Sequence, residues 1–324
     1  MSKLDAAARA ADIAATLLHS LVPPEVRRAE QLLTNGSSAS SAACEAALRT
    51  LLEFHQDVVS PVSSAFSFAL PCGAALRAIG RHAPAGVIEA GAGNGLWAAL
   101  IRTSLPVHAS DCAPPECAWD DELRVMPTRD TASHAAAALL LCWPPLELEV
   151  PDGSGESSSR AMHASNQRWD ARDQKWDGRN RMAVEELAAF RGSTLIYVGE
   201  WRGHTGLLSA LSDRTAEYGQ TGGEVFQTAV GREWELLESV RLPRWPGFTD
   251  RMLVFQRKWM GGACGGSTPS TEASAASADA AAVAAAATGR AGMAARLKRL
   301  ASLGLTQRAA VAAAVMLQQF LVDQ

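Results

Sequence analysis

Short uninterrupted apolar runs recur through the middle of the chain and predict strands that are buried on both faces of a sheet. Three such runs end near Ile88, Cys142 and Val198. Runs of this length, without polar alternation, are typical of central parallel strands. Stretches with helical spacing, such as 96–102 and 182–190, lie between them. The alternation of the two patterns predicts an α/β domain with helices on both faces of a mostly parallel sheet.

Further short strands complete this sheet. Residues 107–111 and 123–126 are expected to add two parallel strands. Residues 234–240 and 251–257 also have strand composition, and a loop of about ten residues separates them. A short connection of this kind joins antiparallel neighbours. We therefore expect a Rossmann-like, seven-stranded sheet that is mostly parallel and has an antiparallel last strand.

The two ends of the chain have a helical pattern instead. Residues 1–60 read as an N-terminal helical cap, with a substrate lid as the alternative, and residues 61–258 as the α/β domain. A polar insertion spans 147–180 within that domain, and a Gly-, Ser- and Ala-rich linker spans 259–292. Residues 293–324 read as C-terminal helices. They carry an apolar stripe that either docks on the core or binds another chain: Leu297, Leu300, Val311, Val315 and Leu317.

A glycine-rich turn follows the first buried strand, and most of the functional interpretation depends on it. Residues 87–97 read Val-Ile-Glu-Ala-Gly-Ala-Gly-Asn-Gly-Leu-Trp. A strand, a glycine turn and a helix N-terminus in this order form a ligand site at the carboxyl end of a parallel sheet. The glycines allow a tight turn and a close approach of the backbone to a ligand. A purely structural turn, with glycines for packing, is the alternative.

The spacing of the glycines separates two kinds of nucleotide cofactor. A dinucleotide fingerprint has a further glycine at the position that Leu96 occupies here. The pattern acid-x-Gly-x-Gly-x-Gly instead resembles the first motif of the class I S-adenosylmethionine-dependent methyltransferases. That cofactor has a cationic amino acid, a ribose and an adenine, but no pyrophosphate, so acidic residues suit it. The resemblance implies that the turn binds S-adenosylmethionine through Glu89, Gly91, Ala92, Gly93, Asn94 and Gly95.

Two later carboxylates extend the expected cofactor site. Asp111 ends the strand 107–111, about 20 residues beyond the glycine turn, where a carboxylate can accept both ribose hydroxyls. Asp130 follows the strand 123–126. The methyltransferase resemblance implies a carboxylate near the adenine amino group at this place.

The expected acceptor side begins where the strand 138–142 ends in Trp143-Pro144-Pro145. Amino-methylating members of the superfamily have an acid or amide in the place of Trp143. An indole cannot accept a proton or orient an amine through a carbonyl, which argues against adenine or amide methylation in that manner. We expect Trp143 and Pro144 to shape the acceptor pocket.

An acid and an imidazole lie at the carboxyl end of the strand 193–200. Glu200 is the last residue of this strand, and His204 lies on the loop after it. Both are candidates to orient the acceptor or take its proton. A loop-ordering hydrogen bond is the alternative role for His204.

The combination of motifs is similar to an uncharacterised methyltransferase-like family of microbial and fungal proteins, over about residues 61–258. The shared motifs are Glu-x-Gly-Ala-Gly-x-Gly-x-Trp, Cys-Trp-Pro-Pro, Tyr-Val-Gly-Glu and a late Trp-Pro-Gly. They correspond here to residues 89–97, 142–145, 197–200 and 245–247. This resemblance implies the fold and the cofactor, but no particular acceptor.

Composition narrows the class of protein further. The chain of 324 residues has 48% hydrophobic residues, enough for a sizeable core, and a formal net charge of −4, which gives no case for binding nucleic acid or an anionic membrane. Basic and aromatic residues alternate within 168–179, but aspartates there offset most of the charge.

Six scattered cysteines lack zinc spacing, so no metal site is expected. Without a membrane span or a clear signal peptide, we expect a cytoplasmic protein, with organelle targeting as an open alternative.

The sequence thus predicts a methyltransferase that uses S-adenosylmethionine and acts on an unassigned acceptor, either a small molecule or a macromolecule. A catalytically inactive cofactor-binding protein that works through its helical ends is the main alternative. A dinucleotide-dependent oxidoreductase and a nucleic-acid-modifying enzyme are further alternatives. Leu96 and the antiparallel strand pair argue against the first of these, and the charge balance argues against the second.

Overall fold

The structure is a computed structural model. It describes residues 2–35, 39–115, 118–125, 136–146, 181–211, 213, 215–258, 297–298, 301–302 and 308–322. The polar insertion 147–180, the linker 259–292, Asp130 and Leu300 therefore lie outside the described residues.

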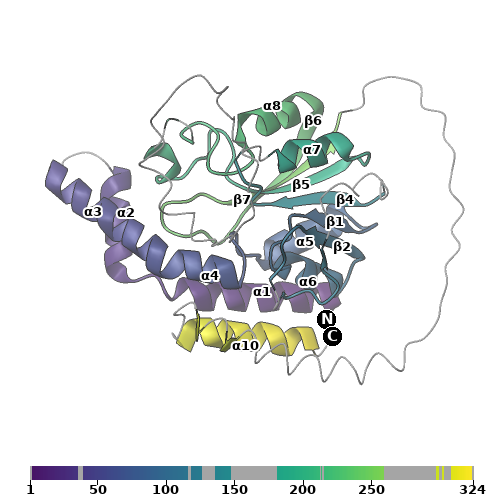
Figure 1. The fold of residues 1–324 in the computed structure, drawn as a ribbon, viewed down its shortest axis with the longest axis horizontal. Coiled ribbons are helices and arrows are strands. Elements are labelled where there is room, and N and C mark those ends of the chain that lie inside the picture. Colours follow the sequence, from purple (N-terminus) through teal and green to yellow (C-terminus); the bar gives the residue numbers. More distant parts are fainter. Residues whose placement is uncertain are drawn as a thin grey trace, which may run out of the picture.

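A seven-stranded sheet forms the centre of the molecule, in the order β3-β2-β1-β4-β5-β7-β6 (Figure 1). The first five strands run parallel to one another, and β7 is antiparallel to both β5 and β6. The strands are β1 (Val87–Ala90), β2 (Val107–Asp111), β3 (Arg124–Val125), β4 (Ala138–Cys142), β5 (Thr194–Gly199), β6 (Trp234–Arg241) and β7 (Arg251–Arg257). This order and orientation define a Rossmann-like methyltransferase-type sheet, so the predicted fold class is confirmed.

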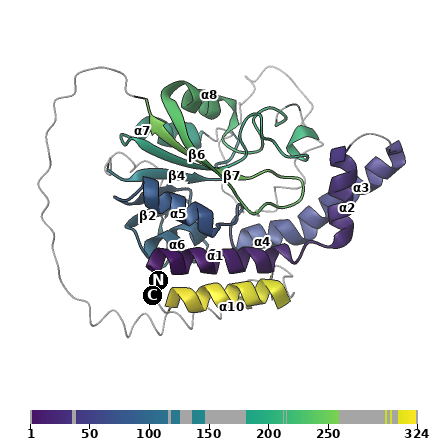
Figure 2. The same ribbon diagram turned by 180° about the vertical axis from the view of Figure 1, so that it is seen from behind.

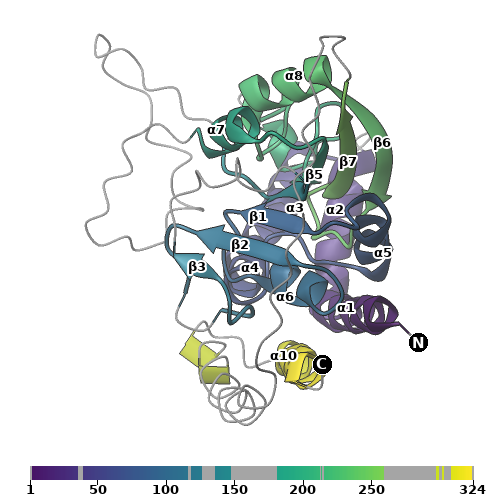
Figure 3. The same ribbon diagram turned by 90° about the vertical axis from the view of Figure 1, so that its right-hand side faces the viewer.

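Helices cover both faces of the sheet (Figure 3). On one face lie α5 (Gly73–His82) and α6 (Leu96–Arg102), and on the other lie α7 (Met182–Ala189) and α8 (Gly223–Glu233). Alternate side chains of each central strand point to opposite faces: Leu140 belongs to the core beneath α5 and α6, whereas Leu139 and Leu141 belong to the core beneath α7 and α8. Both faces are dry, which is the physical reason for the uninterrupted apolar runs.

The N-terminal helices add a further layer on the α5–α6 side. Helix α1 (Lys3–His19) packs against α5 and α6. Helices α2 (Pro24–Asn35) and α3 (Ser41–Phe54) pair with each other and project from the sheet domain (Figures 1 and 2). A π-helical turn (His55–Val59) and α4 (Ser60–Ala65) lead back toward the sheet. The C-terminal helix α10 (Arg308–Val322) lies along α1 in both views, as the outermost layer.

Two features bear on the class of protein. None of the described helices is long and apolar enough to cross a membrane. Within the part of the chain that the structure describes, no group of three or more His, Cys, Asp and Glu side chains is placed to hold a metal ion.

Helix α5 has no side-chain cap of its own, and α1 supplies one. The N-cap residue of α5 is Cys72, whose side chain makes no capping hydrogen bond. Instead Oδ1 of Asp12 accepts the backbone N–H of Gly73 at 2.7 Å. A Cβ atom at Gly73 would lie 2.9 Å from the carbonyl oxygen of Ala8, so glycine is what lets the two helices approach this closely. The carboxylate satisfies one orphan donor and also opposes the positive end of the α5 dipole.

This cap gives a first prediction. Asp12→Ala should lower the free energy of unfolding by about 1–2 kcal/mol, because it removes both the capping bond and the charge. Urea denaturation followed by circular dichroism measures the change. Asp57→Ala is the matched control, since Asp57 is exposed and has no hydrogen bond or ion pair within the described part of the chain. Equal stability of the two variants would contradict the proposed cap.

Candidate functional site

The glycine turn connects β1 to α6 and is held against the end of β2. Gly91, Gly93 and Gly95 have φ values of 70°, 57° and 70°, which are left-handed conformations that favour glycine. The N–H groups of Gly91 and Ala92 donate to the carbonyl oxygen of Ser110 at 2.9 and 3.0 Å. The turn is therefore tied to the sheet at the strand that carries Asp111.

The three glycines of the turn face different surroundings. A Cβ atom at Gly91 would lie 2.6 Å from Cε of Met182, and one at Gly95 would lie 2.9 Å from Cβ of Asp120. A Cβ atom at Gly93 would meet nothing within 4 Å. Gly93 is thus the point of the turn at which the backbone is open to a ligand.

Asp111 lies beside this open point, where the sequence predicts it. Its Oδ2 accepts the N–H of Gly93 at 2.8 Å, and its Oδ1 accepts the N–H of Ala113 at 2.8 Å. The side chain is only half-buried. Asp111 therefore both shapes the turn and presents a carboxylate next to Gly93.

Glu89 lies in the central strand beneath the turn, with an exposed fraction of 1%. Burial, and to a smaller extent the charges of Asp120 and Asp111, raise the pKa of Glu89 to about 8, and a backbone hydrogen bond at Ala98 opposes this shift. Its Oε2 is buried without a hydrogen-bond partner among the described residues. A buried acceptor of this kind is costly unless a ligand or a proton satisfies it.

A second set of contacts fixes the turn from outside, and the sequence analysis missed it. Asn94 donates from Nδ2 to the carbonyl oxygen of Ser64 at 2.8 Å and accepts the N–H of Trp119 on its own carbonyl oxygen at 2.6 Å. The guanidinium group of Arg102, on α6, donates two hydrogen bonds to the carboxylate of Asp120: Nε to Oδ1 at 2.9 Å and Nη2 to Oδ2 at 2.8 Å. The segment 118–120 has no motif that could have revealed this role.

Trp143 follows β4 in a strained conformation, with a φ of 51°. Its indole Nε1 donates to Oδ1 of Asp250 at 2.8 Å, and its ring stacks on Phe68 with centroids 5.4 Å apart and planes 13° apart. Phe248 meets the indole edge-on at 5.6 Å. Pro144 is buried beside Trp143, and its carbonyl oxygen accepts the N–H of Gly222 at 2.9 Å. Of the two residues expected to shape the acceptor pocket, Trp143 thus forms an aromatic wall with Phe68 and Phe248, and Pro144 follows it directly in the chain.

Asp250 is the acid of this wall, and the sequence analysis did not single it out. It is 4% exposed, and burial, with the charge of Glu200 as a smaller cause, raises its pKa to about 7, while the bond from Trp143 opposes the shift. Cys142 lies close to both Glu89 and Asp250, since both charges add to the burial that raises its thiol pKa. The position of Asp250 could have been predicted from the strand arrangement. Strand β7 is antiparallel to β5, so β7 begins beside the carboxyl end of β5, and the residue before β7 lies at that edge of the sheet.

Glu200 does not have the accessible position that a catalytic role requires. It is 0% exposed, and its Oε1 accepts the N–H groups of Gly206 at 2.8 Å and Thr249 at 3.2 Å. Its Oε2 accepts the N–H of Gln220 at 3.1 Å and the hydroxyl of Ser209. These four donors occupy both oxygens, so the expectation that Glu200 faces an acceptor is corrected: this carboxylate ties three loops together.

His204 is exposed on the loop after β5. Its backbone N–H donates to Trp201 at 2.8 Å, and its carbonyl oxygen accepts the hydroxyl of Thr249 at 2.5 Å. No hydrogen bond within the described residues joins its imidazole to Glu200. The two predicted catalytic side chains therefore do not form a pair. Asp130, the predicted adenine contact, lies outside the described residues.

Comparison with known proteins adds fold neighbours. The chain matches no family model and no curated protein. It is similar to a solved structure of Burkholderia thailandensis 1,6-didemethyltoxoflavin-N1-methyltransferase with bound 1,6-didemethyltoxoflavin and S-adenosylhomocysteine, at 16% identity and a TM-score of 0.32, covering 68% of this chain and 92% of that one. It is also similar to the mitomycin 7-O-methyltransferase MmcR, at 14% identity and a TM-score of 0.31, covering 73% and 69%. The fold class stated above depends on the strand order of this chain itself.

The role of Glu200 yields a stability prediction. Glu200→Ala should lower the free energy of unfolding by at least about 3 kcal/mol, because several buried donors lose their acceptor at once. Guanidinium denaturation measures this loss. Glu235→Ala is the control, because Glu235 is exposed on β6. A fully stable Glu200→Ala protein would return Glu200 to the list of catalytic candidates.

Glu89 yields a pH prediction whose sign follows from its raised pKa. Between its ordinary value of 4.5 and about 8, the folded protein keeps a proton that the unfolded chain has released. The free energy of unfolding should therefore fall as the pH rises through this window, by up to about 1.4 kcal/mol per pH unit. Because the Gln side chain does not titrate, Glu89→Gln lacks this fall. The difference in free energy of unfolding between the native protein and Glu89→Gln should therefore change as the pH rises through the window. Parallel stability curves for the two proteins would show that Glu89 titrates normally.

Proposed function

We propose that this protein is an S-adenosylmethionine-dependent methyltransferase, with its cofactor held by the glycine turn. The observation that carries the proposal is the open backbone at Gly93 beside Asp111 at the end of β2. In the strand that leads into the same turn, Oε2 of Glu89 is buried without a hydrogen-bond partner among the described residues. This arrangement lies at the carboxyl end of the central strands of a methyltransferase-type sheet.

The side chains at the turn fit a cationic ligand better than a pyrophosphate. Glu89, Asp111 and Asp120 gather there, and only Asp120 has an arginine partner. The carboxylate of Asp111 would repel a pyrophosphate, whereas the ammonium and ribose hydroxyls of S-adenosylmethionine can donate to the carboxyl groups of Asp111 and Glu89. Glu89 and Asp111 would provide these acceptors, and Gly91, Ala92, Gly93, Asn94 and Gly95 would form the backbone cradle.

When bound, S-adenosylmethionine would supply a methyl group activated by its positive sulfur. The protein would contribute mainly by positioning an acceptor against that group. The wall of Trp143, Phe68 and Phe248, with Pro144 behind it, supports an acceptor-facing role for this region. Asp250 is a better candidate than Glu200 to act on the acceptor, since four donors already occupy Glu200.

A catalytically inactive cofactor-binding protein is the second candidate, and one observation favours it. Trp143 stands where amino-methylating enzymes have an acid or amide, and the nearest acid, Asp250, already accepts from the Trp143 indole. Binding of S-adenosylmethionine without transfer of a labelled methyl group to any of a broad set of acceptors would support this alternative.

Isothermal titration with S-adenosylmethionine tests the cofactor proposal through a pair of glycine variants. Gly93→Ala should weaken binding by about tenfold or more, because the new methyl group enters the space proposed for the ligand. Gly203→Ala is a close control: Gly203 also has a left-handed φ, of 74°, and a Cβ there meets nothing within 4 Å. Both variants carry the same backbone penalty of about 1 kcal/mol, so only Gly93→Ala should lose affinity.

A second pair of variants tests the contribution of the Asp111 carboxylate separately from that of the glycine turn. Asp111→Asn should also weaken binding, whereas Asp121→Asn, at an exposed neighbouring acid, should not. If the native protein takes up neither S-adenosylmethionine nor S-adenosylhomocysteine, the cofactor proposal is wrong. If it takes up NADH instead, the oxidoreductase alternative replaces it.

A further inference from the structure

The C-terminal helix α10 packs on α1 through small residues. Its buried side chains are Ala310, Ala313, Ala314, Leu317 and Gln318. Helix α1 likewise contributes a series of buried alanines to the same core. The predicted apolar stripe is divided between two faces: Leu317 is buried, whereas Val315 is 42% exposed and Val311 is half-buried. The alanine face docks on α1, and none of the described elements packs over the second apolar face of α10.

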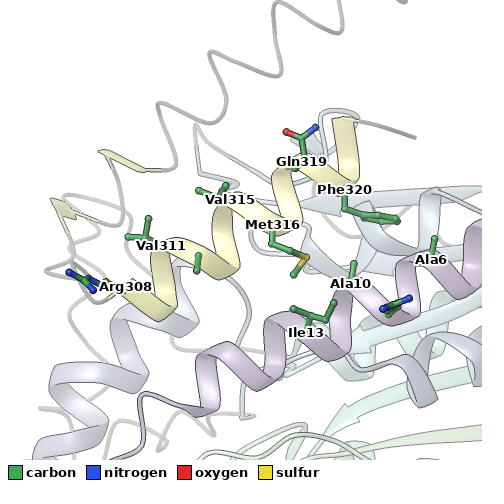
Figure 4. A pocket seen from close by; sticks show the side chains of 11 residues that line it. Ala6, Ala10, Ile13, Arg308, Val311, Val315, Met316, Gln319 and Phe320 are labelled. Carbon is green, nitrogen blue, oxygen red and sulfur yellow. The ribbon is translucent and has the colours of Figure 1, made fainter.

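That second face forms one wall of a groove between α1 and α10. The groove has a volume of about 930 Å³, and apolar side chains make up most of its walls. Figure 4 shows Met316 and Phe320 of α10 pointing toward Ile13 and Ala10 of α1, whereas Val315 lies on the side of α10 turned away from α1. Ile13 and Val315 are each 42% exposed. Exposed aliphatic side chains that line one groove are typical of a binding surface.

The charges at this groove all have one sign. Arg9 of α1 and Arg308 of α10 belong to its lining, and no acidic residue does. Neither arginine has an ion pair with any residue in the described part of the chain. The groove therefore combines an apolar floor with two arginines that have no acidic partner among the described residues.

We propose that the groove between α1 and α10 binds an amphipathic α-helix of another protein, with acidic residues beside its apolar stripe. Two adjacent helices leave an elongated groove into which the side-chain ridge of a third helix packs. Acidic residues on that helix pair with Arg9 and Arg308. A second copy of this chain is disfavoured in the same place, because its groove presents the same two arginines and no acid.

This surface is attached firmly to the fold. Helix α1 packs on α5 and α6 beneath it, and Asp12 of α1 caps α5. The groove is therefore preformed, which lowers the entropic cost of binding. The proposal does not depend on the cofactor proposed above.

A charge exchange tests the proposal. The probes are two fluorescent helical peptides of roughly 18 residues, with leucine at i, i+3, i+4 and i+7 and either Glu or Lys beside the leucine stripe. By fluorescence anisotropy, the full chain should bind the Glu peptide at least about tenfold more tightly than the Lys peptide. The double variant Arg9→Glu/Arg308→Glu should reverse this preference, and Val315→Glu should abolish binding of both peptides.

The matched control is Arg49→Glu/Leu52→Glu on α3, where an exposed arginine also lies near an exposed aliphatic residue. It should leave the affinity for the Glu peptide unchanged. All substituted residues are exposed, and circular dichroism verifies that the variants remain folded. Three results would overturn the proposal: no saturable binding of the Glu peptide, equal affinity for both peptides, or self-association that Val315→Glu removes, which would assign the groove to a second copy of this chain.

Discussion

Buried carboxyl groups constrain the whole carboxyl edge of this sheet, because each needs donors, a cation or a proton. Glu200 has four donors, and these come from the loops that follow β5, precede α8 and precede β7. Those loops have little regular structure of their own, so their shape depends on one side chain. Asp120 meets the same requirement with Arg102, and Asp250 with the indole of Trp143. Among these four, Glu89 has a fully buried oxygen without a hydrogen-bond partner within the described residues, which makes it a position ready to receive a ligand.

Helix α1 connects this site to the outer surface of the molecule. It packs on α6, whose first residue follows the glycine turn, and its Asp12 caps α5. Its opposite side holds α10 and forms half of the groove. Small residues make both contacts close: glycine at position 73 on one side and alanines on the other. The N-terminal segment is therefore part of the scaffold of the glycine turn, in addition to any role as a cover.

The fold was predictable because local patterns and long-range packing agree. The apolar runs of β1, β4 and β5 indicate that these strands are buried on both faces of the sheet. The short loop between β6 and β7 indicates that these two strands pair in antiparallel orientation. The position of Asp111 was predictable for the same reason, since strand order fixes where a strand end lies. The role of Asp120 depends on contacts across long stretches of chain that no local pattern encodes, and for Asp250 the strand arrangement gives the position but not the bond to Trp143. Glu200 shows the converse: its place at a strand end suggested contact with an acceptor, but only the packing of distant loops reveals that its oxygens are occupied.

The strained conformation of Trp143 depends on the contacts around it, in the region that we propose faces the acceptor. A non-glycine residue with a φ of 51° has a conformational cost of about 1–2 kcal/mol, which surrounding contacts must offset. The stack on Phe68, the indole bond to Asp250 and the backbone bond to Val198 provide that stabilisation. Asp250 in turn needs the indole, since it is buried and has no ion pair with any described residue. The strained residue and the buried acid therefore stabilise each other, and together they fix an aromatic surface and a carboxyl group at the same edge of the sheet as the glycine turn. Strain maintained in this way at a strand end is more typical of a working site than of a structural turn.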